Sequence, residues 1–260
     1  MIRRFSSPGF HGVGGIALAD LGLAPPGGAA VPYSLSYDGS DDETDCGTGA
    51  SIVGLNAGAM TVDCYWQCPA GLAVSTAYTL ASQGDVIAAN QGWFLGIITG
   101  NPASAGNAYF GAMGAVAWVS RQQATALVPG TWYYVRARIA GSGPGFVGMG
   151  VSVALVENYL AGLYQQPGTA SALHLLHARS GSATHFHGKG NICYIHMWNV
   201  DKGALAAVPT TPFAVDANTV GRWIHSEGAG ASLGDTSGNA NNGAISGATW
   251  STTVPAGWSL

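Results

Sequence analysis

Charge is scarce in this chain. Only 8% of its 260 residues are charged, against roughly 25% in an ordinary soluble domain. Hydrophobic residues make up a normal 47%, so small and neutral polar residues replace Lys and Glu. A surface this poor in charge loses little hydration energy when it is covered. We therefore expect it to pack against copies of itself or other subunits. The alternative is a glycine-rich β-protein with a merely neutral surface.

Positive charge is especially rare, and this argues against nucleic acid as a partner. Nine Lys and Arg residues stand against thirteen Asp and Glu, for a net charge of −4. Phosphate binding needs clustered basic residues, and the nearest approach is Arg3-Arg4. No apolar run approaches the roughly 20 residues that span a bilayer, so we expect no membrane insertion. Residues 6–12 interrupt any secretion signal, and we expect none.

Cysteine is sparse too. The four cysteines are Cys46, Cys64, Cys68 and Cys193. An even number permits disulfides, but without a secretion signal we expect reduced thiols. The alternative is a zinc site built from Cys64, Cys68, Cys193, His185, His187 and His196. Residues 64 and 68 lie about 13 Å apart along an extended strand, so we favour buried free thiols.

The chain does contain many short strand-like runs. Residues 33–37, 60–66, 131–139 and 191–198 are examples, each bounded by Gly, Pro, Asn or Ser. Helical periodicity is nearly absent, and we expect one helical turn within residues 157–165. Many short strands separated by turns predict an all-β sandwich or barrel.

The first 32 residues are irregular. Pro25-Pro26-Gly27-Gly28 punctuates them, and we predict an extended N-terminal arm over residues 1–32. The alternative is a plain linker. A single sandwich domain is predicted over residues 33–260.

Four segments resemble the laminin-G-like jelly roll of the concanavalin A-like lectin/glucanase superfamily. They are YSLSYDGSDD at residues 33–42, MTVDCYW at 60–66, PGTWYYV at 129–135 and FHGKGNICYIHMWN at 186–199. The resemblance implies a two-sheet antiparallel β-sandwich. Because domains of this kind without signal peptides are found in bacteriophage virion proteins, it also implies a viral structural protein.

A fifth segment, residues 223–250, resembles the stretch that normally opens the domain in that family. It contains Glu227-Gly228, then DTSGNANNG from Asp235 and GATW from Gly247. Here it closes the chain, which indicates a circular permutation, with residues 220–250 supplying edge strands beside residues 33–37. A partial second repeat is the alternative.

The carboxylates do not indicate catalysis. Superfamily members that cleave polysaccharides need two carboxylates flanking the bond, usually alternating along one strand. The glutamates are Glu43, Glu157 and Glu227, and none has such an acidic partner in a strand-like run. No nucleophile elbow or phosphate loop is present. We expect no enzymatic activity.

Oxygen ligands for Ca²⁺ gather at two places. One set is Asp38, Asp41, Asp42, Glu43 and Asp45; the other is Asp235, Asn239 and Asn241. At both places the alternative is turn formation, with Asx side chains bonding nearby backbone N–H groups. We expect no other cofactor.

Aromatic and histidine side chains are the remaining candidates. We expect Trp93, Trp250 and Trp258 to be exposed and to bind glycans, whereas five tryptophans in strand-like runs belong to the core: Trp66, Trp118, Trp132, Trp198 and Trp223. Four histidines are expected on polar strand faces, with a pH-sensing interface as the alternative. These are His174, His177, His185 and His187.

The combined prediction is a non-enzymatic structural or adhesive subunit of a bacteriophage virion, as a tail, spike, fibre or capsid-decorating protein. It would associate with itself and with other virion subunits and contact host surface glycans. The alternative is a carbohydrate-binding module of a secreted or cell-surface protein, located outside the cell.

Overall fold

The computed structural model describes residues 31–55, 58–84, 92–100, 102, 105–113, 118–141, 145–151, 157–160, 171–180 and 184–260. One compact unit spans Val31–Leu260, while the predicted arm, apart from residues 31 and 32, lies outside the described residues. Within the described part, no helix is long and apolar enough to cross a membrane. Its one helix, α1 (Ala50–Gly54), is short.

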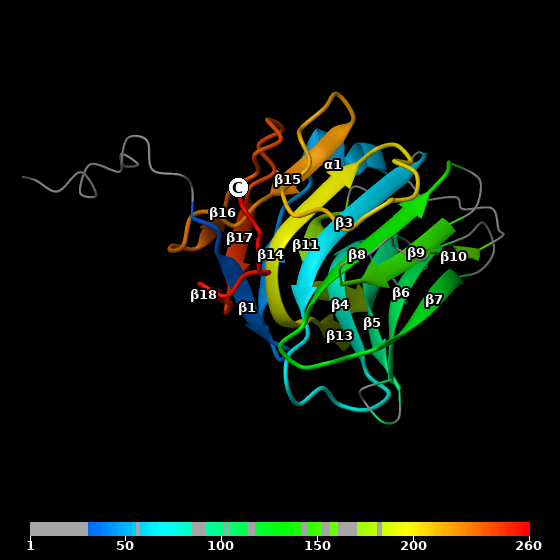
Figure 1. The fold of residues 1–260 in the computed structure, drawn as a ribbon. Coiled ribbons are helices and arrows are strands. Elements are labelled where there is room, and N and C mark those ends of the chain that lie inside the picture. The colour runs from blue at the N-terminus through cyan, green and yellow to red at the C-terminus, as the bar shows by residue number, and fades with distance from the viewer. Residues whose placement is uncertain are drawn as a thin grey trace, which may run out of the picture. The chain divides into compact units, whose positions relative to one another are not determined.

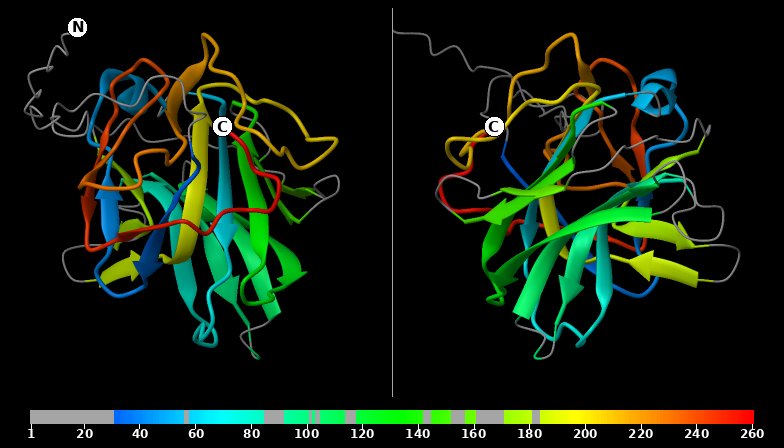
Figure 2. Two further views of the ribbon diagram at one scale, coloured as in Figure 1. Left: turned by 60° about the vertical axis from the view of Figure 1, so that its left-hand side comes forward. Right: turned by 90° about the vertical axis from the view of Figure 1, so that its right-hand side faces the viewer.

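Two large antiparallel sheets form the unit (Figures 1 and 2). Sheet A has the strand order β10 (Glu157–Leu160), β9 (Gly145–Gly150), β8 (Trp132–Ile139), β3 (Met60–Gln67), β14 (Lys189–Trp198), β1 (Ser34–Asp38) and β18 (Thr249–Ser251). A further strand, β15 (Thr219–Trp223), also pairs with β14.

Sheet B has the strand order β16 (Ser232–Leu233), β17 (Gly243–Ser246), β2 (Glu43–Asp45), β11 (Leu173–Leu175), β4 (Ala77–Gln83), β5 (Trp93–Thr99), β6 (Ala105–Met113) and β7 (Trp118–Ala126). A separate hairpin joins β12 (His177–Ser180) to β13 (Thr184–His187). The predicted two-sheet antiparallel sandwich is confirmed.

The main core combines side chains from both sheets. Sheet A contributes Leu35, Val62, Trp66, Val135 and Ile195, and sheet B contributes Trp93, Leu95, Ile97 and Phe110, all fully buried. Burying one such side chain stabilises the fold by about 1.5–3 kcal/mol. The apolar positions of the strand-like runs therefore face each other across the sandwich.

Two local expectations are wrong. Residues 157–160, expected within a helical turn, form β10, which pairs with β9; residues 161–170 lie outside the described part. An isolated helical turn is costly to nucleate, and the ladder with β9 satisfies the backbone instead. Residues 43–45, for which turn formation was the alternative to a calcium site, form β2 between β17 and β11.

The C-terminal segment supplies strands to both sheets. As expected, it lies beside residues 33–37, because β18 pairs with β1 and places Trp250 opposite Leu35. On sheet B, β17 pairs with β2. Gly247 of the GATW motif has φ +78°, and an added Cβ would meet Asp42 Oδ1 at 2.0 Å. The GATW motif therefore packs tightly against the turn that contains Asp42. The circular permutation itself stays a prediction.

Candidate ligand pocket on the outer face of sheet A

Along β3, the outer face of sheet A is buried as completely as its inner face. Thr61 and Asp63 alternate with core residues along β3 and so lie on the other side of the sheet, yet neither is exposed. Residues 199–218, here called the link, join β14 to β15 and cover this face together with the C-terminal tail. Trp258 of the tail packs 5.0 Å from Tyr65 and 5.3 Å from Tyr194, measured between ring centroids.

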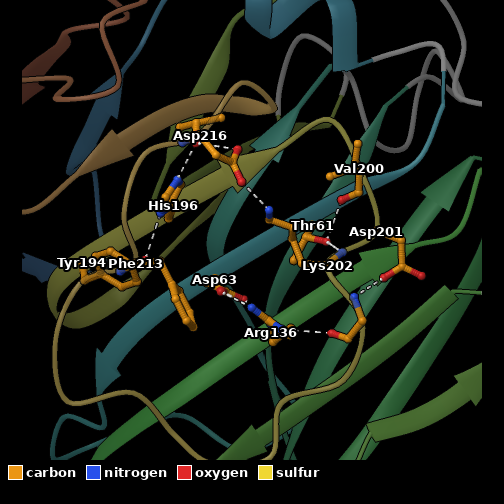
Figure 3. A network of polar contacts seen from close by, with 12 residues as sticks. Thr61, Asp63, Arg136, Tyr194, His196, Val200, Asp201, Lys202, Phe213 and Asp216 are labelled. Carbon is orange, nitrogen blue, oxygen red and sulfur yellow. Dashed lines mark hydrogen bonds and ion pairs between the residues drawn. The ribbon is translucent and has the colours of Figure 1, made fainter.

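Two arginines of β8 hold the link against the sheet. Arg136 lies opposite Asp63 in the β3–β8 register. Its Nε and Nη2 donate to the two Asp63 carboxylate oxygens at 2.6 Å, and its Nη1 donates to Gly203 O at 3.0 Å. Arg138 Nη1 donates to both carboxylate oxygens of Asp201, at 3.0 and 2.8 Å. The cross-strand ion pair therefore fixes the start of the link (Figure 3).

A neutral histidine anchors the other end of the link. His196 Nδ1 lies 3.1 Å from Tyr194 Oη and its Nε2 lies 3.2 Å from Thr219 Oγ1 (Figure 3). Its ring stacks on Trp198 at 3.7 Å. Burial, and secondarily the charge of Arg222, lowers the pKa of His196 to about 3. The imidazole is therefore uncharged at neutral pH. One of its nitrogens donates a hydrogen bond and the other accepts one, so the ring adds no charge to the outer face.

A pocket of about 390 Å³ opens between the link and sheet A. The strands contribute Arg136 and Trp198, and the link contributes Lys202, Leu205, Phe213, Ala214, Val215 and Asp216. The Trp198 and Phe213 rings meet edge to face with centroids 5.9 Å apart. Lys202 Nζ lies 5.5 Å from the Trp198 ring centroid and donates to Asp216 Oδ2. Aromatic rings beside hydrogen-bonding groups suit a ligand with both apolar and hydroxyl-bearing surfaces.

The tryptophans predicted to be exposed mostly are not. Trp93 is fully buried and its Nε1 donates to Gln83 Oε1 at 3.1 Å. Trp258 is 6% exposed because the tail folds onto sheet A. Both expectations of exposure are therefore wrong. Trp250 is half-buried, and its Nε1 donates to Gly230 O.

Of the tryptophans assigned to the core, Trp66, Trp198 and Trp223 are buried and Trp132 is partly buried. The side chain of Trp118 lies outside the described part. Trp198 nevertheless lines the pocket, and sequence reasoning missed this role. Its neighbour Phe213 lies in the link, where no periodic pattern marks a ligand residue.

The five carboxylates of the first calcium prediction do not form one site. Oxygens of Asp38, Asp41 and Asp42 lie within 4.8 Å of one another. Asp42 Oδ2 accepts from Asp38 N and Asp38 Oδ1 accepts from Ser40 N, both at 2.7 Å, as expected of a turn. Burial raises the pKa of Asp42, and the charges of Asp38 and Asp41 add to this.

The other two members of that set lie on β2. Asp45 Oδ1 accepts from Gly47 N at 2.7 Å. Glu43 is grouped instead with His174 and His177. The strand therefore separates these two carboxylates from the turn, although all five are close in sequence.

The second calcium set forms a hydrogen-bonded turn. The Asp235 carboxylate accepts from the backbone N of Arg222, Ser237 and Asn241 and from Ser237 Oγ. Nδ2 of Asn239 and of Asn241 both donate to Val220 O. Through these hydrogen bonds, the three residues tie residues 235–241 to β15.

The zinc set built on cysteine is not assembled in the described part of the chain. Cys64 belongs to the core between the sheets, whereas Cys193 belongs to the cluster on the outer face of sheet A. All four cysteines are buried and free. Burial raises the pKa of Cys68 to about 11 and that of Cys64 still further. His196 is engaged by Tyr194 and Thr219, and the side chain of His185 is not described.

A scan against protein-family models gave no match, and neither did a search of curated proteins. Among solved structures, the chain is similar to a putative carbohydrate binding protein from Bacteroides ovatus, with 10% identity and a TM-score of 0.51 over 87% of this chain and 61% of that one. The fold is a lectin-like jelly roll. The chain spans only 61% of that protein's length.

Two weaker structural similarities concern proteins of different kinds. The Ruminococcus gnavus IT-sialidase CBM40, bound to alpha2,3 sialyllactose, has 10% identity and a TM-score of 0.48 over 68% of this chain and 95% of that one. Tailspike protein 2 from Escherichia coli O157:H7 bacteriophage CAB120 has 11% identity and a TM-score of 0.44 over 72% of this chain and 28% of that one. At these values neither similarity identifies a function.

Proposed function

We propose that the chain is a carbohydrate-binding domain whose site is the pocket between the link and sheet A. The observation that carries this proposal is the combination of two aromatic rings and a Lys–Asp pair around one opening in a lectin-like fold. The pocket volume of about 390 Å³ lies within the range of about 300–1,000 Å³ found for small-molecule sites. It therefore suits a short stretch of a glycan.

The charges around the pocket favour a neutral sugar. The guanidinium of Arg136 is matched by Asp63, and the ammonium of Lys202 is matched by Asp216. An acidic sugar would meet no uncompensated cation among these residues. Hydroxyl groups, in contrast, can accept from Lys202 and donate to Asp216.

The carboxylates of Asp63 and Asp216 support binding without hydrolysis. A glycosidase needs a carboxyl group whose pKa is raised so that it can act as a general acid. Lys202, through its hydrogen bond, lowers the pKa of Asp216, and both Asp63 oxygens accept hydrogen bonds from Arg136. We therefore propose no catalytic role for either residue.

Filling the pocket tests the proposal. Val215 lines it and is 38% exposed, so Val215→Trp should occupy the opening without disturbing the core. Glycan-array screening followed by calorimetry on the best neutral ligand should show at least a tenfold weaker affinity for this variant, or about 1.4 kcal/mol. Val128→Trp is the matched control, since Val128 is 54% exposed and is not among the pocket's lining residues.

Two results would contradict the proposal. The first is equal glycan affinity for the two variants at equal melting temperature. The second is binding restricted to sialylated or sulfated glycans, because the compensated charges predict the opposite preference.

As the setting of this domain, we propose the virion of a bacteriophage, where self-association would bring several sugar sites together. What favours this is the surface: of the few charged side chains, Asp42, Asp63, Arg136 and Arg138 are buried, which leaves the exterior poorer still in charge. Capsid or tail genes beside its gene, and particles in electron micrographs, are the expected findings. A monodisperse monomer that never joins particles would favour an extracellular or cell-surface module.

A further inference from the structure

Sheet B and the β12–β13 hairpin bring together three side chains of metal-ligating types from distant parts of the sequence. Glu43 lies on β2 and His174 lies on β11, which pairs with β2 so that Leu175 is opposite Thr44. Thr44 and Leu175 are fully buried. Because side chains alternate along a strand, Glu43 and His174 both lie on the face of sheet B that points away from the core.

A left-handed residue brings a second histidine to the same place. In a continuous strand, residues 174 and 177 would point to opposite faces. Leu176 has φ +57°, a conformation that is costly for a bulky residue, and it separates β11 from β12. Its backbone is held by Leu80 O and by Gly188 N. The centroids of the His174 and His177 rings are consequently only 5.2 Å apart.

The three side chains converge on one point. His174 Nδ1 lies 3.5 Å from Glu43 Oε2, and His177 Nδ1 lies 2.9 Å from the same oxygen. All three ligand atoms lie within 4.8 Å of one another. Ligands held about 2.1 Å from a tetrahedral zinc ion are separated by about 3.4 Å. The observed separations bracket this value, so slight side-chain rotation would admit the ion.

We propose that Glu43, His174 and His177 bind a divalent transition metal, with zinc as the representative ion. Two imidazoles and one carboxylate are donors that Zn²⁺ prefers, and a three-ligand set leaves one coordination position for water or an external ligand. The side chains of His177, His174 and Glu43 are 5%, 13% and 33% exposed. The site is therefore set into the surface, with the carboxylate at its opening.

The surroundings of the cluster are suited to holding these ligands in place. His187 lies opposite His177 in the β12–β13 hairpin, and the two rings pack with centroids 5.0 Å apart. Ser82 Oγ donates to His177 O at 2.7 Å, which anchors the start of β12 to β4. The site lies on sheet B and the β12–β13 hairpin, whereas the proposed sugar pocket is built from sheet A and the link, so the two proposals can fail separately.

Zinc titration of untagged protein at pH 7.5 tests the proposal. Calorimetry should detect one ion with a dissociation constant of about 10 µM or tighter, and Co²⁺ should give visible absorption bands of a low-coordinate N/O site. Glu43→Gln and His174→Ala should each weaken zinc binding by at least about tenfold.

Asp41→Asn is the matched control, since Asp41 is exposed and belongs to the neighbouring acidic group. Its zinc affinity should equal that of the wild type. Circular dichroism of each variant establishes that it is folded. The proposal is overturned if folded wild-type protein binds no zinc at about 1 mM. It is equally overturned if His174→Ala leaves the affinity unchanged, or if Asp41→Asn lowers it as much as Glu43→Gln does.

Discussion

Along β3, the two faces of sheet A are equally inaccessible but are buried by different chemistry. On β3, Val62 and Trp66 pack into the apolar core, while Thr61 and Asp63 lie under the link with no exposed area. Apolar packing is non-directional and tolerates volume-conserving changes. A buried ion pair depends on both partners, because either charge alone remains desolvated. The inner face therefore stabilises the sandwich, and the outer face positions the link and its pocket.

The largest effect on stability is predicted for breaking the Asp63–Arg136 ion pair on the outer face of sheet A. Arg136→Met leaves the Asp63 carboxylate buried without its partner, which should lower the free energy of unfolding by about 3–5 kcal/mol. Ile195→Val on the inner face should cost only about 0.5–1.5 kcal/mol. Urea unfolding at pH 7 measures both variants.

A double variant supplies the control for that prediction. Asp63→Asn combined with Arg136→Met removes both charges and should be more stable than Arg136→Met alone. If Arg136→Met costs no more than Ile195→Val, the contrast between the two faces is wrong.

A second prediction uses pH. The pKa of His196 on the outer face, and that of fully buried His225, are each lowered by burial to about 3, from an ordinary value of 6.5. Between these values the unfolded chain binds more protons, so stability is complete above pH 6.5 and falls as pH decreases. Each histidine should contribute a loss of about 2 kcal/mol between pH 6.5 and 5.

Unfolding free energies measured across that range check the prediction. His196→Gln removes one of the two histidines whose pKa is lowered to about 3, so it should reduce their joint contribution to the slope by about half even though it lowers the stability at pH 7. An unchanged slope would show that folding does not lower the pKa of His196.

Much of the fold was predictable because the strands of the sandwich carry local signals. The run at residues 60–66 was identified as a strand although its alternation is imperfect. The structure gives the reason. Both faces of β3 are buried, so its residues do not have to alternate strictly between polar and apolar types. The burial of Trp93 and Trp258 was not predictable, because it depends on the opposite sheet and on the returning tail, which no local pattern encodes.

The sites were far less predictable. Asp63 and Arg136 become partners only through the β3–β8 register, which cannot be read from either strand alone. Glu43 was grouped with its sequence neighbours, whereas its structural partners His174 and His177 lie on β11 and β12. That arrangement needs both the β2–β11 pairing and the left-handed Leu176, and a bulky residue gives no sequence signal for such a conformation.

The smallest effect on stability is predicted for the Lys202–Asp216 pair on the outer face of sheet A. At this pair, a loss of glycan binding can be distinguished from a loss of stability. Lys202 and Asp216 pair at the pocket, but their side chains are 28% and 40% exposed. Exposed pairs contribute about 0–1 kcal/mol, so Lys202→Ala should leave the unfolding free energy nearly unchanged. The same variant removes a hydrogen-bond donor from the proposed sugar site and should weaken glycan binding by about tenfold, or 1.4 kcal/mol.

Calorimetry and urea unfolding of one protein sample give both numbers. A large loss of stability would mean that Lys202, like Arg136, holds the link in place, and unchanged binding would mean that the sugar does not contact this pair.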